Sequence, residues 1–472
     1  MIRLLVNDRL HDIEVPPGVV LLDALRRHLR LTGVREACRE GDCGSCLVLL
    51  GEERDAGRFY RPVNSCLVPS GDAVGRHVVT IEGLNGEGLS PIQQAVVDEG
   101  ATQCGFCTPG LVVALTAFLL NAERLDEEEA CAAMAGNICR CTGYLSLRRV
   151  AAGLCERFGA RTPPPRGSRA RVEWLVAEGI LPPYFLALPE PPATAPAPRS
   201  RRAAKAVPVV VGGGTDLFVQ RPEELESTEL VFLSRTPGLA GITVADGVCR
   251  IGAATPTEDI GESPVLRGFF PELPSFWRLI SSQPIRHRAT LAGNLVNASP
   301  IGDLTIFFLA LDATLTLRAG ERLRELPLRE FFQGYKQLDM APGETVESLA
   351  FAVPTAADRL TFEKVSRRTH LDIASVNSAL GLRVEGDVIV HARLSAGGVA
   401  PIPMRLTRTE ALLAGRRVDA ATVQAAMAMA REEIAPITDV RGSAEYKREL
   451  LGRLVAAHFL RLFPAETMEV AL

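Results

Sequence analysis

Eight of the 11 cysteines fall into two groups of four, and their spacing indicates iron–sulfur chemistry. The first group has the spacing C-x4-C-x2-C followed by a distant fourth cysteine, and the second reads C-x2-C followed by C-x-C. The members are Cys38, Cys43, Cys46 and Cys66, then Cys104, Cys107, Cys139 and Cys141. The first spacing is typical of sites that hold two irons and two sulfides through four thiolates. The two groups therefore predict two [2Fe-2S] clusters.

Such clusters are anionic, so they need backbone N–H donors near the sulfur atoms. Gly41, Gly44 and Ser45 are suited to this role, because small side chains let the peptide wrap closely around a sulfur. In the second group, Cys107 stands directly before Thr108-Pro109, a helix-start signal. We expect the positive end of that helix to face the cluster.

Two other readings of the eight cysteines remain open. Disulfides are the first, although an odd cysteine count does not suit a fully paired secreted framework. Zinc is the second, because four thiolates also suit a tetrahedral structural site. For the three remaining cysteines, Cys131, Cys155 and Cys249, we expect only a role as small buried apolar side chains.

Length and composition fit a large soluble protein without a general affinity for polyanions. The 472 residues suggest roughly three domains, and 47% of them are hydrophobic. A net charge of -4 makes nucleic acid an unexpected partner. The N-terminus lacks an unbroken apolar core, and the longest apolar stretch, 111–120, is too short to cross a bilayer. We expect a cytoplasmic protein that does not associate with membranes.

The elements needed to position the cysteines can be predicted from periodicity and capping signals. In residues 1–84 we expect a β-grasp domain, with strands at 2–6, 12–15, 47–50, 62–68 (carrying Cys66) and 78–84 and a helix at 21–31. In residues 85–160 we expect a four-helix domain, with helices at 92–99, 111–121, 125–136 and 147–158 and Thr108 capping the second. The cysteines of the second group lie at the ends of these helices.

Residues 161–205 interrupt this pattern with proline-rich and basic runs. We expect mostly an extended, solvated linker, within which residues 172–188 can form a short helix and a docking segment. After the linker, residues 207–211 read as a strand that leads into Gly212, Gly213 and Gly214. Consecutive glycines can gather N–H groups around a diphosphate, although a structural turn is an equally good reading. A second segment, 281–303, is also rich in small and hydroxyl side chains, and the two loops could enclose a dinucleotide.

The motifs CREGDCGSC (38–46), QCGFCTPG (103–110) and CRCTGY (139–144) resemble those of the molybdenum hydroxylases, the family of xanthine dehydrogenase and aldehyde oxidase. The resemblance implies that the helical domain's cluster lies next to a molybdenum cofactor, with Gln103 and Cys141 near its pterin. The ferredoxin-like cluster would then pass electrons onward.

The glycine-rich segments resemble the FAD-binding domain of the same family, which has the vanillyl-alcohol-oxidase type of α+β fold. The resemblance implies that FAD is bound by Val210, Val211, Gly212, Gly213, Gly214, Thr215, Asp216 and Leu217, and by Thr290, Leu291, Gly293 and Asn294. It also implies Asp303 near the adenosine half, Val346 and Lys364 beside the flavin, and Ile280 near its ring. Ala292 replaces a glycine that is usual in the family.

We assign residues 206–345 to this domain and 346–472 to a small α+β C-terminal domain like that of the CO-dehydrogenase flavoproteins. The C-terminal domain should have strands around 382–394 and helices at 421–433 and 444–462.

The arrangement as a whole resembles the small subunit of bacterial xanthine dehydrogenases. It implies that xanthine or hypoxanthine is oxidised to urate on a molybdenum-binding partner chain, in a heterotetramer with two copies of each subunit. Electrons would reach NAD through both clusters and FAD, and no residue of this chain would be catalytic. Thr369, His370 and Leu371 replace an acidic run of many relatives, so the acceptor stays open. Other molybdenum hydroxylases, acting on aldehydes or N-heterocycles, and a free-standing electron carrier are the alternatives.

Overall fold

The computed structural model describes residues 1–54, 56–191 and 208–470, and these form two compact units. Unit 1 consists of Met1–Phe232 together with Ser282–Arg288, and unit 2 consists of Leu233–Ser281 together with Ala289–Leu472. Residues 192–205 of the expected linker lie outside the described residues.

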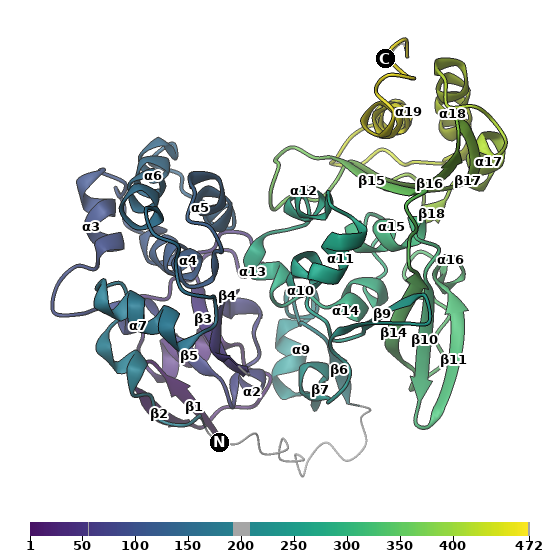
Figure 1. The fold of residues 1–472 in the computed structure, drawn as a ribbon. Coiled ribbons are helices and arrows are strands. Elements are labelled where there is room, and N and C mark those ends of the chain that lie inside the picture. The colour runs from purple at the N-terminus through teal and green to yellow at the C-terminus, as the bar shows by residue number, and fades with distance from the viewer. Residues whose placement is uncertain (55, 192–207, 471–472) are drawn as a thin grey trace. The chain divides into compact units, whose positions relative to one another are not determined.

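Unit 1 begins with the expected β-grasp sheet (Figure 1). Its strands are β1 (Ile2–Val6), β2 (Arg9–Ile13), β3 (Leu47–Arg54), β4 (Gly57–Asn64) and β5 (His77–Val79), in the order β2-β1-β5-β3-β4. The β1–β5 pair is parallel and the other pairs are antiparallel. The helix α1 (Leu21–Asp23) continues into a π-helical turn, η1 (Ala24–His28).

Two predicted strands of this domain are too long. The strand predicted at 62–68 ends at Asn64, because its partner β3 begins at Leu47, directly opposite. Cys66 therefore lies in the 3-10 turn η2 (Ser65–Leu67). The strand predicted at 78–84 ends at Val79, because the next N–H, that of Thr80, donates to the Asn7 side chain, and the 3-10 turn η3 (Ile81–Leu84) follows.

The predicted four-helix domain consists of α3 (Pro91–Asp98), α4 (Thr108–Asn121), α5 (Glu127–Met134) and α6 (Leu145–Gly159). Ser90 and Gln93 form a capping box at the start of α3. Thr108 is not a cap: it is the first residue of α4, Cys107 holds the cap position, and the Thr108 hydroxyl bonds to Thr102 at 2.8 Å. The side chains from Gly110 to Leu120 are all buried, so α4 is a central helix that packs against β3 and β4.

The described part of the expected linker is ordered against this core. It forms α7 (Arg169–Ala177) and the 3-10 turn η4 (Pro183–Leu186). Leu175, Ile180 and Phe185 are buried in the same apolar cluster as α4. Arg171 is also buried, and its guanidinium donates to the carbonyl oxygens of Pro164 and Ala122. Residues 164–186 therefore tie the linker to the helical domain.

Unit 1 ends with a short parallel pair of strands, β6 (Val209–Val211) and β7 (Leu230–Phe232), which are connected by α8 (Leu217–Gln220) and α9 (Pro222–Ser227). Their apolar side chains join the core of the β-grasp domain. The helix α13 (Gln283–Arg286) comes from much later in the sequence and completes the unit.

Unit 2 contains an antiparallel sheet of order β11-β10-β14-β9-β8 (Figure 1). Its strands are β8 (Ile242–Ala245), β9 (Val248–Gly252), β10 (Thr314–Ala319), β11 (Arg322–Pro327) and β14 (Thr345–Ala352). The helices packed with it are α10 (Thr257–Glu262), α11 (Pro264–Phe269), α12 (Leu273–Arg278), α14 (Leu291–Val296) and α15 (Asp303–Ala310). Shorter elements are η5 (Leu233–Arg235), α16 (Leu328–Phe331), β12 (Phe332–Gly334) and β13 (Gln337–Leu338).

The rest of unit 2 is a four-stranded antiparallel sheet covered by helices, in the region where the sequence predicted strands around 382–394 and two helices. The strands are β15 (Asp358–Val365), β16 (Val376–Glu385), β17 (Val388–Gly397) and β18 (Met404–Arg405). The helices are α17 (Thr407–Leu413), α18 (Ala420–Glu433) and α19 (Ala444–Leu462). The helix α15 also packs against β16 and β17, so the two sheets share a layer of side chains.

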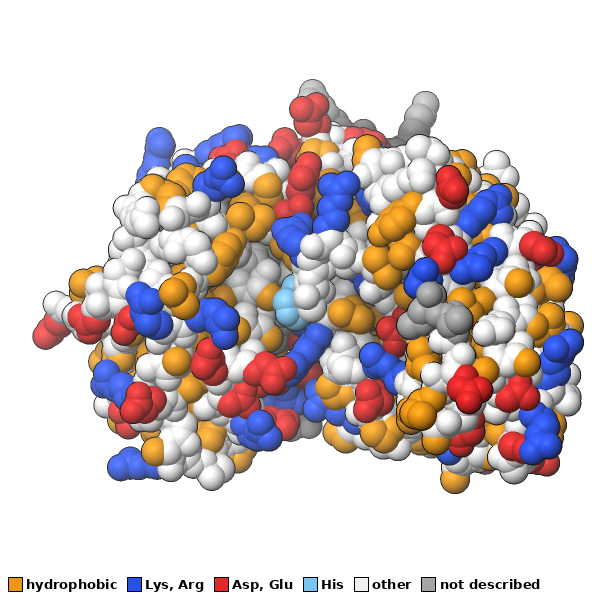
Figure 2. Space-filling view, turned by 90° about the horizontal axis from the view of Figure 1, so that it is seen from above, with side chains coloured by type: hydrophobic (Ala, Val, Ile, Leu, Met, Phe, Trp, Pro, Cys, Tyr) orange, Lys and Arg blue, Asp and Glu red, His pale blue; other side chains and the backbone are white. Residues whose placement is uncertain are grey.

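Among the residues described, no helix is both long and apolar enough to cross a bilayer. On the face drawn in Figure 2, cationic and anionic side chains are interspersed. This distribution agrees with the low net charge of the sequence.

Replacing Arg171 with methionine tests how firmly residues 164–186 are held. The change leaves two buried carbonyl oxygens without a donor, so we expect a loss of about 3 kcal/mol in the free energy of unfolding. Urea titration followed by far-UV circular dichroism measures it. Arg169→Met is the matched control, since the Arg169 side chain is 78% exposed and pairs only with Glu173. Equal effects of the two changes would contradict the role given to Arg171.

Candidate functional site

The first cysteine group is arranged as two close pairs in unit 1. The Sγ atoms of Cys38 and Cys43 are 3.3 Å apart, and those of Cys46 and Cys66 are 3.4 Å apart. Two thiolates on one tetrahedral metal with bonds of ~2.3 Å are separated by about 3.7 Å, so each pair is close to the spacing that one iron requires. The group thus fits a [2Fe-2S] cluster in which each iron takes one pair.

The loop between these cysteines supplies backbone donors, as expected. The N–H groups of Glu40 and Cys43 both point at the Cys38 sulfur, each at 3.4 Å. The Gly41 backbone donates to Cys66 and the Ser45 backbone to Cys43. Gly41 and Gly44 have φ angles of 80° and 66°, a left-handed conformation that glycine adopts without strain. The hydrogen bond from Cys38 is the main reason that the pKa of Cys43 is lowered to about 5.

The second cysteine group is also paired. The Sγ atoms of Cys104 and Cys141 are 3.6 Å apart, and Cys107 interacts with Cys139. Cys107 caps α4, so the unpaired N–H groups of that helix face the group, as predicted. The Cys104 and Cys141 side chains are exposed, whereas Cys107 and Cys139 are buried.

The pairing bears on the two alternative readings. All 11 cysteines carry free thiols, so no disulfide occurs among them. In the part of the chain that the structure describes, no three or more His, Cys, Asp or Glu side chains are grouped as a single metal ion would need. Pairs of thiols suit a two-iron cluster better than one zinc ion, which would draw all four sulfurs together.

The two cysteine groups are joined through the backbone. The Ile138 N–H, one residue before Cys139, donates to the Cys43 carbonyl oxygen at 3.0 Å. The buried Asn137 side chain donates to the Gly44 carbonyl oxygen at 3.1 Å. Gly110 packs so closely that a Cβ atom there would lie 2.2 Å from the same oxygen. One hydrogen bond and one covalent step therefore separate a ligand residue of one group from a ligand residue of the other.

A short segment from the second glycine-rich region covers the first cysteine loop. The Ile285 side chain lies 2.6 Å from the position that a Cβ atom on Gly41 would take. Arg288, at the end of the same segment, forms a buried ion pair with Asp72 at 2.6 Å and donates to the Gly213 carbonyl oxygen at 3.0 Å. Residues 282–288 therefore connect the cysteine loop to the first glycine loop.

The first glycine loop connects β6 to α8. The eight residues that the resemblance assigns to FAD here, from Val210 to Leu217, span the end of β6, this loop and the first residue of α8. Gly214 has a φ of 83°, and its carbonyl oxygen accepts from the Phe218 N–H at 3.0 Å. This turn suits a close approach of the backbone to a diphosphate, but the assignment of each residue stays a prediction.

The second FAD segment starts α14 in unit 2. Thr290 caps this helix by accepting the Gly293 N–H at 3.2 Å, and Leu291 is buried. Asn294 accepts a hydrogen bond from the Thr305 hydroxyl at 3.5 Å. Ala292 is buried beneath the turn and its N–H donates to the Ala253 carbonyl oxygen at 3.0 Å, so the fold accommodates the methyl group.

Two further predicted FAD residues, Asp303 and Lys364, form a buried ion pair of 2.8 Å. The Lys364 ammonium also donates to the Leu279 carbonyl oxygen at 2.6 Å. Asn377, which we did not predict, donates to the other Asp303 oxygen at 2.6 Å and to the Ile301 carbonyl oxygen at 3.1 Å. Its signal in the sequence was an amide side chain within the mostly apolar segment 376–382. The Lys364 ammonium has a third N–H, which can serve a flavin.

The remaining predicted residues are also buried in unit 2. Ile280 follows α12, and Val346 lies in β14. The loop of residues 369–371, which lacks the acidic run of many relatives, packs beside Ile280. The Leu371 N–H donates to the Ser281 carbonyl oxygen, and the His370 ring bonds to the Arg278 carbonyl oxygen at 2.9 Å. His370 is partly buried and helps to fix this loop.

Four family models match the chain in succession. They are a 2Fe-2S iron-sulfur cluster binding domain at 4–70, a [2Fe-2S] binding domain at 80–152, an FAD binding domain in molybdopterin dehydrogenase at 199–355, and a CO dehydrogenase flavoprotein C-terminal domain at 361–462. These matches assign to the chain two [2Fe-2S] domains, an FAD-binding domain of the type found in molybdopterin dehydrogenases and a CO dehydrogenase flavoprotein C-terminal domain. Both [2Fe-2S] domains and the FAD-binding domain are thereby confirmed.

Known proteins agree with these models. The chain is 28% identical to xanthine dehydrogenase of Emericella nidulans over 92% of its length, and 28% identical to aldehyde oxidase 2 of Rattus norvegicus over 93%. It spans only 36% and 37% of these two relatives. Among solved structures, a chain of carbon monoxide dehydrogenase from Hydrogenophaga pseudoflava matches 56% of this chain and 90% of its own length, with 26% identity and a TM-score of 0.51.

Replacing Gly110 with alanine tests the contact between the two cysteine loops. The new methyl group would meet the Gly44 carbonyl oxygen, so the loops must move apart. We expect altered electron paramagnetic resonance signals for both reduced clusters and a loss of iron and acid-labile sulfide from the protein. Gly153→Ala in α6 is the control, because a Cβ atom there meets nothing within 4 Å. Unchanged cluster signals in Gly110→Ala would show that the contact is dispensable.

A second prediction separates flavin binding from stability. Lys364→Met removes the partner of Asp303, and we expect the FAD content of the purified protein to fall at least about tenfold while both clusters stay bound. Lys447→Met is a close match, because Lys447 is equally buried and pairs with Asp439 at 2.7 Å and with the Ile437 carbonyl oxygen. The control should lose comparable stability yet keep its FAD. Loss of FAD from both variants would assign Lys364 a structural role only.

Proposed function

We propose that this chain transfers electrons for a molybdenum hydroxylase, from a molybdenum cofactor on a partner chain through two [2Fe-2S] clusters to FAD and then to NAD. The observation that carries the proposal is the direct backbone link between the two cysteine groups, from Cys43 through Ile138 to Cys139. Electron transfer between clusters needs such close packing, whereas two independent structural sites would not.

The order of the carriers follows from exposure and from connectivity. Cys104 and Cys141 are exposed and are flanked by the exposed apolar side chains of Phe106, Ile138 and Leu145. An apolar surface around a redox site suits a partner, so the helical domain's cluster is placed as the entry point. On the other side, Ile285 covers the first cysteine loop, and five peptide steps along the chain lead from it to Ile280. We therefore propose that the first cluster passes its electrons to the flavin, beside which Ile280 is expected.

FAD suits the last position because it accepts single electrons and delivers a hydride. The residues of this chain would bind and orient it: the glycine loop for the diphosphate, and Asp303 and Lys364 for the remainder. NAD is the acceptor that we propose, and none of the chain's own side chains is assigned to the chemistry of the substrate.

For the substrate we propose xanthine or hypoxanthine, oxidised to urate on a larger partner in a heterotetramer with two copies of each chain. The match to a xanthine dehydrogenase over 92% of the chain supports it. A second candidate is an aldehyde, because the match to aldehyde oxidase 2 is equally extensive. N-heterocycles are a further option for the substrate. A free-standing electron carrier that works without a molybdenum partner is the alternative from a different functional class.

Free thiols at all the cysteines are consistent with the cytoplasm as the location.

The protein isolated natively from its source tests this proposal. We expect size-exclusion chromatography to give a complex several times heavier than the 50.8 kDa chain, with molybdenum co-eluting with iron and flavin. Anaerobic addition of excess xanthine should then reduce both clusters and the flavin over two or more turnovers, because each turnover supplies two electrons and the three groups together take four. NAD should reoxidise them. Reduction by an aldehyde but not by xanthine would replace the purine assignment. An active monomer without molybdenum would refute the subunit proposal.

A further inference from the structure

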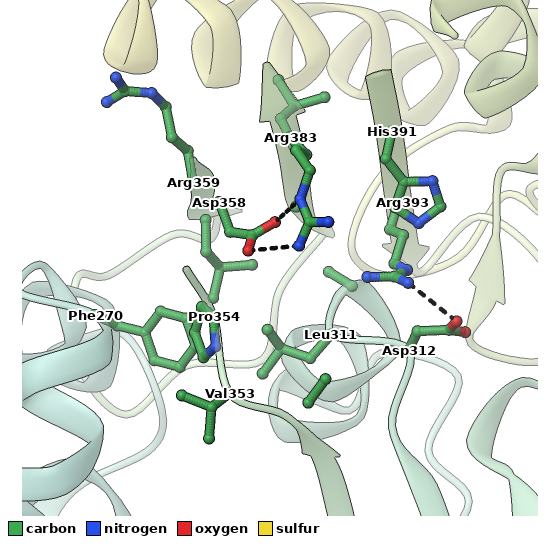
Figure 3. A pocket seen from close by; sticks show the side chains of 15 residues that line it. Phe270, Leu311, Asp312, Val353, Pro354, Asp358, Arg359, Arg383, His391 and Arg393 are labelled. Atoms are coloured by element: carbon green, nitrogen blue, oxygen red, sulfur yellow. Dashed lines mark hydrogen bonds and ion pairs between the residues drawn. The ribbon is translucent and has the colours of Figure 1, made fainter. Parts of the chain in front are cut away.

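A cavity of about 240 Å³ opens in unit 2 between the sheet β15–β18 and the C-terminal end of α15 (Figure 3). Its lining comes from both C-terminal matched domains: Phe270, Leu311 and Asp312 from one, and Arg383, His391 and Arg393 from the other, with Asp358 in the segment between the two matches. Small-molecule sites favour such junctions between domains. The volume is just below the range of about 300–1,000 Å³ that is usual for drug-sized ligands, so only a small molecule fits.

A glycine lies at the strand position of the lining where α15 approaches the sheet most closely. Gly381 in β16 stands directly opposite Leu360 of β15 and Arg393 of β17. Side chains at these paired positions lie in one row on the same face of the sheet. A Cβ atom on Gly381 would lie 2.7 Å from the Ala310 carbonyl oxygen, which shows how closely α15 approaches here. The missing side chain therefore lets the end of α15 approach the sheet in the row that contains Arg393.

Arg393 is the least satisfied cation that lines the cavity. Its side chain is only 32% exposed, and its Nε atom is buried without a hydrogen-bond partner. Its one ion pair in the described residues is with Asp312, at 3.4 Å. Asp312 already accepts from Arg329 at 3.0 Å and from Arg405 at 3.1 Å, so it neutralises Arg393 only in part. Burial lowers the pKa of Arg393, as expected for a cation that lacks a full counter-charge.

The other charged side chains that line the cavity do not provide Arg393 with a full counter-charge. Asp358 is held by Arg383 in a two-pronged contact of 2.8 and 2.9 Å, and it also accepts the Thr355 N–H. His391 lies beside Arg393 on the same face of β17 and adds a second donor (Figure 3). Arg359 turns away and stacks over the Phe463 ring at 5.5 Å. The polar side of the cavity is therefore short of negative charge.

The opposite side of the cavity is apolar. Phe270, Leu311, Val353 and Pro354 form a floor across from the arginines (Figure 3). A guanidinium pairs with planar oxyanions through two parallel hydrogen bonds, and an apolar floor favours an organic body over a fully hydrated ion. A compact carboxylate with a hydrocarbon or aromatic portion matches both sides.

We propose that this cavity binds a small organic carboxylate, whose carboxylate group pairs with Arg393 and whose apolar portion rests on Phe270 and Leu311. The site is separate from the ion pair of Asp303 and Lys364. Asp303 begins α15 and Ala310 ends it, so seven residue steps of ~1.5 Å place them about 10 Å apart. Because the ligand would contact both matched domains of unit 2, its binding would also stabilise their packing.

Calorimetric titration of the full protein, with its cofactors bound, tests the site with benzoate as the probe. We expect saturable benzoate binding, and binding of the uncharged analogue benzamide at least about tenfold weaker. Arg393→Gln should weaken benzoate binding by about 10- to 100-fold and leave benzamide unaffected, because one charge-assisted pair is lost. The flavin absorption spectrum should not change on addition of benzoate.

Arg408→Gln is the matched control, since Arg408 is exposed in the same unit and its guanidinium pairs with Glu432 at 3.8 Å. Its benzoate affinity should equal that of the unchanged protein. The comparison of benzoate with benzamide needs no variant, so it holds even if Arg393→Gln fails to fold. Equal affinity for the two probes, binding of inorganic phosphate as tight as that of benzoate, or no benzoate binding at millimolar concentration would each overturn the proposal.

Discussion

The backbone contact between the loop of Cys43 and Gly44 and the segment of Asn137 and Ile138 is the constraint on which the rest of unit 1 depends. It requires glycine at two positions, 44 and 110, because a side chain at either would meet backbone or the Asn137 amide at under 3 Å. It also requires Asn137 to be buried, with its side-chain amide donating a hydrogen bond to the Gly44 carbonyl oxygen. Small residues near the cysteines thus serve two purposes: they admit backbone donors to sulfur, and they let two domains meet without intervening side chains.

Buried charges hold the neighbouring parts in place, and each has a specific partner. Arg288 is fixed by Asp72 and by the Gly213 carbonyl oxygen, Lys364 by Asp303 and Leu279, and Arg171 by two carbonyl oxygens. A buried ion pair adds little net stability, but removing one partner is costly, because the other charge is then left without compensation. Such pairs therefore select one packing arrangement over others, which suits a protein that must hold several redox groups at fixed distances.

The sequence predicted most of what local rules govern. Cysteine spacing, the Ser90-Pro91 helix start and the alternation in the C-terminal strands located the cysteine groups, the helices and the second sheet correctly. It failed where the outcome depends on a distant partner. The strand expected to carry Cys66 ends at Asn64, because its partner β3 begins at Leu47, directly opposite. Residues 164–186 of the expected linker are ordered because Leu175, Ile180 and Phe185 are buried in the same apolar cluster as α4. Asn377 was missed because nothing near it in the sequence indicates Asp303 as its partner.

The segment 282–288 belongs to unit 1 through its tertiary contacts, although its neighbours in the sequence belong to unit 2. It lies within the glycine- and hydroxyl-rich region that suggests a dinucleotide site, yet its contacts are with the cysteine loop, with Asp72 and with the first glycine loop. Its two flanks belong to unit 2, so the chain enters and leaves unit 1 within seven residues. Four residues, 281–284, separate Ile280 from Ile285, which covers the cysteine loop. This short covalent link is part of the route that we propose between cluster and flavin.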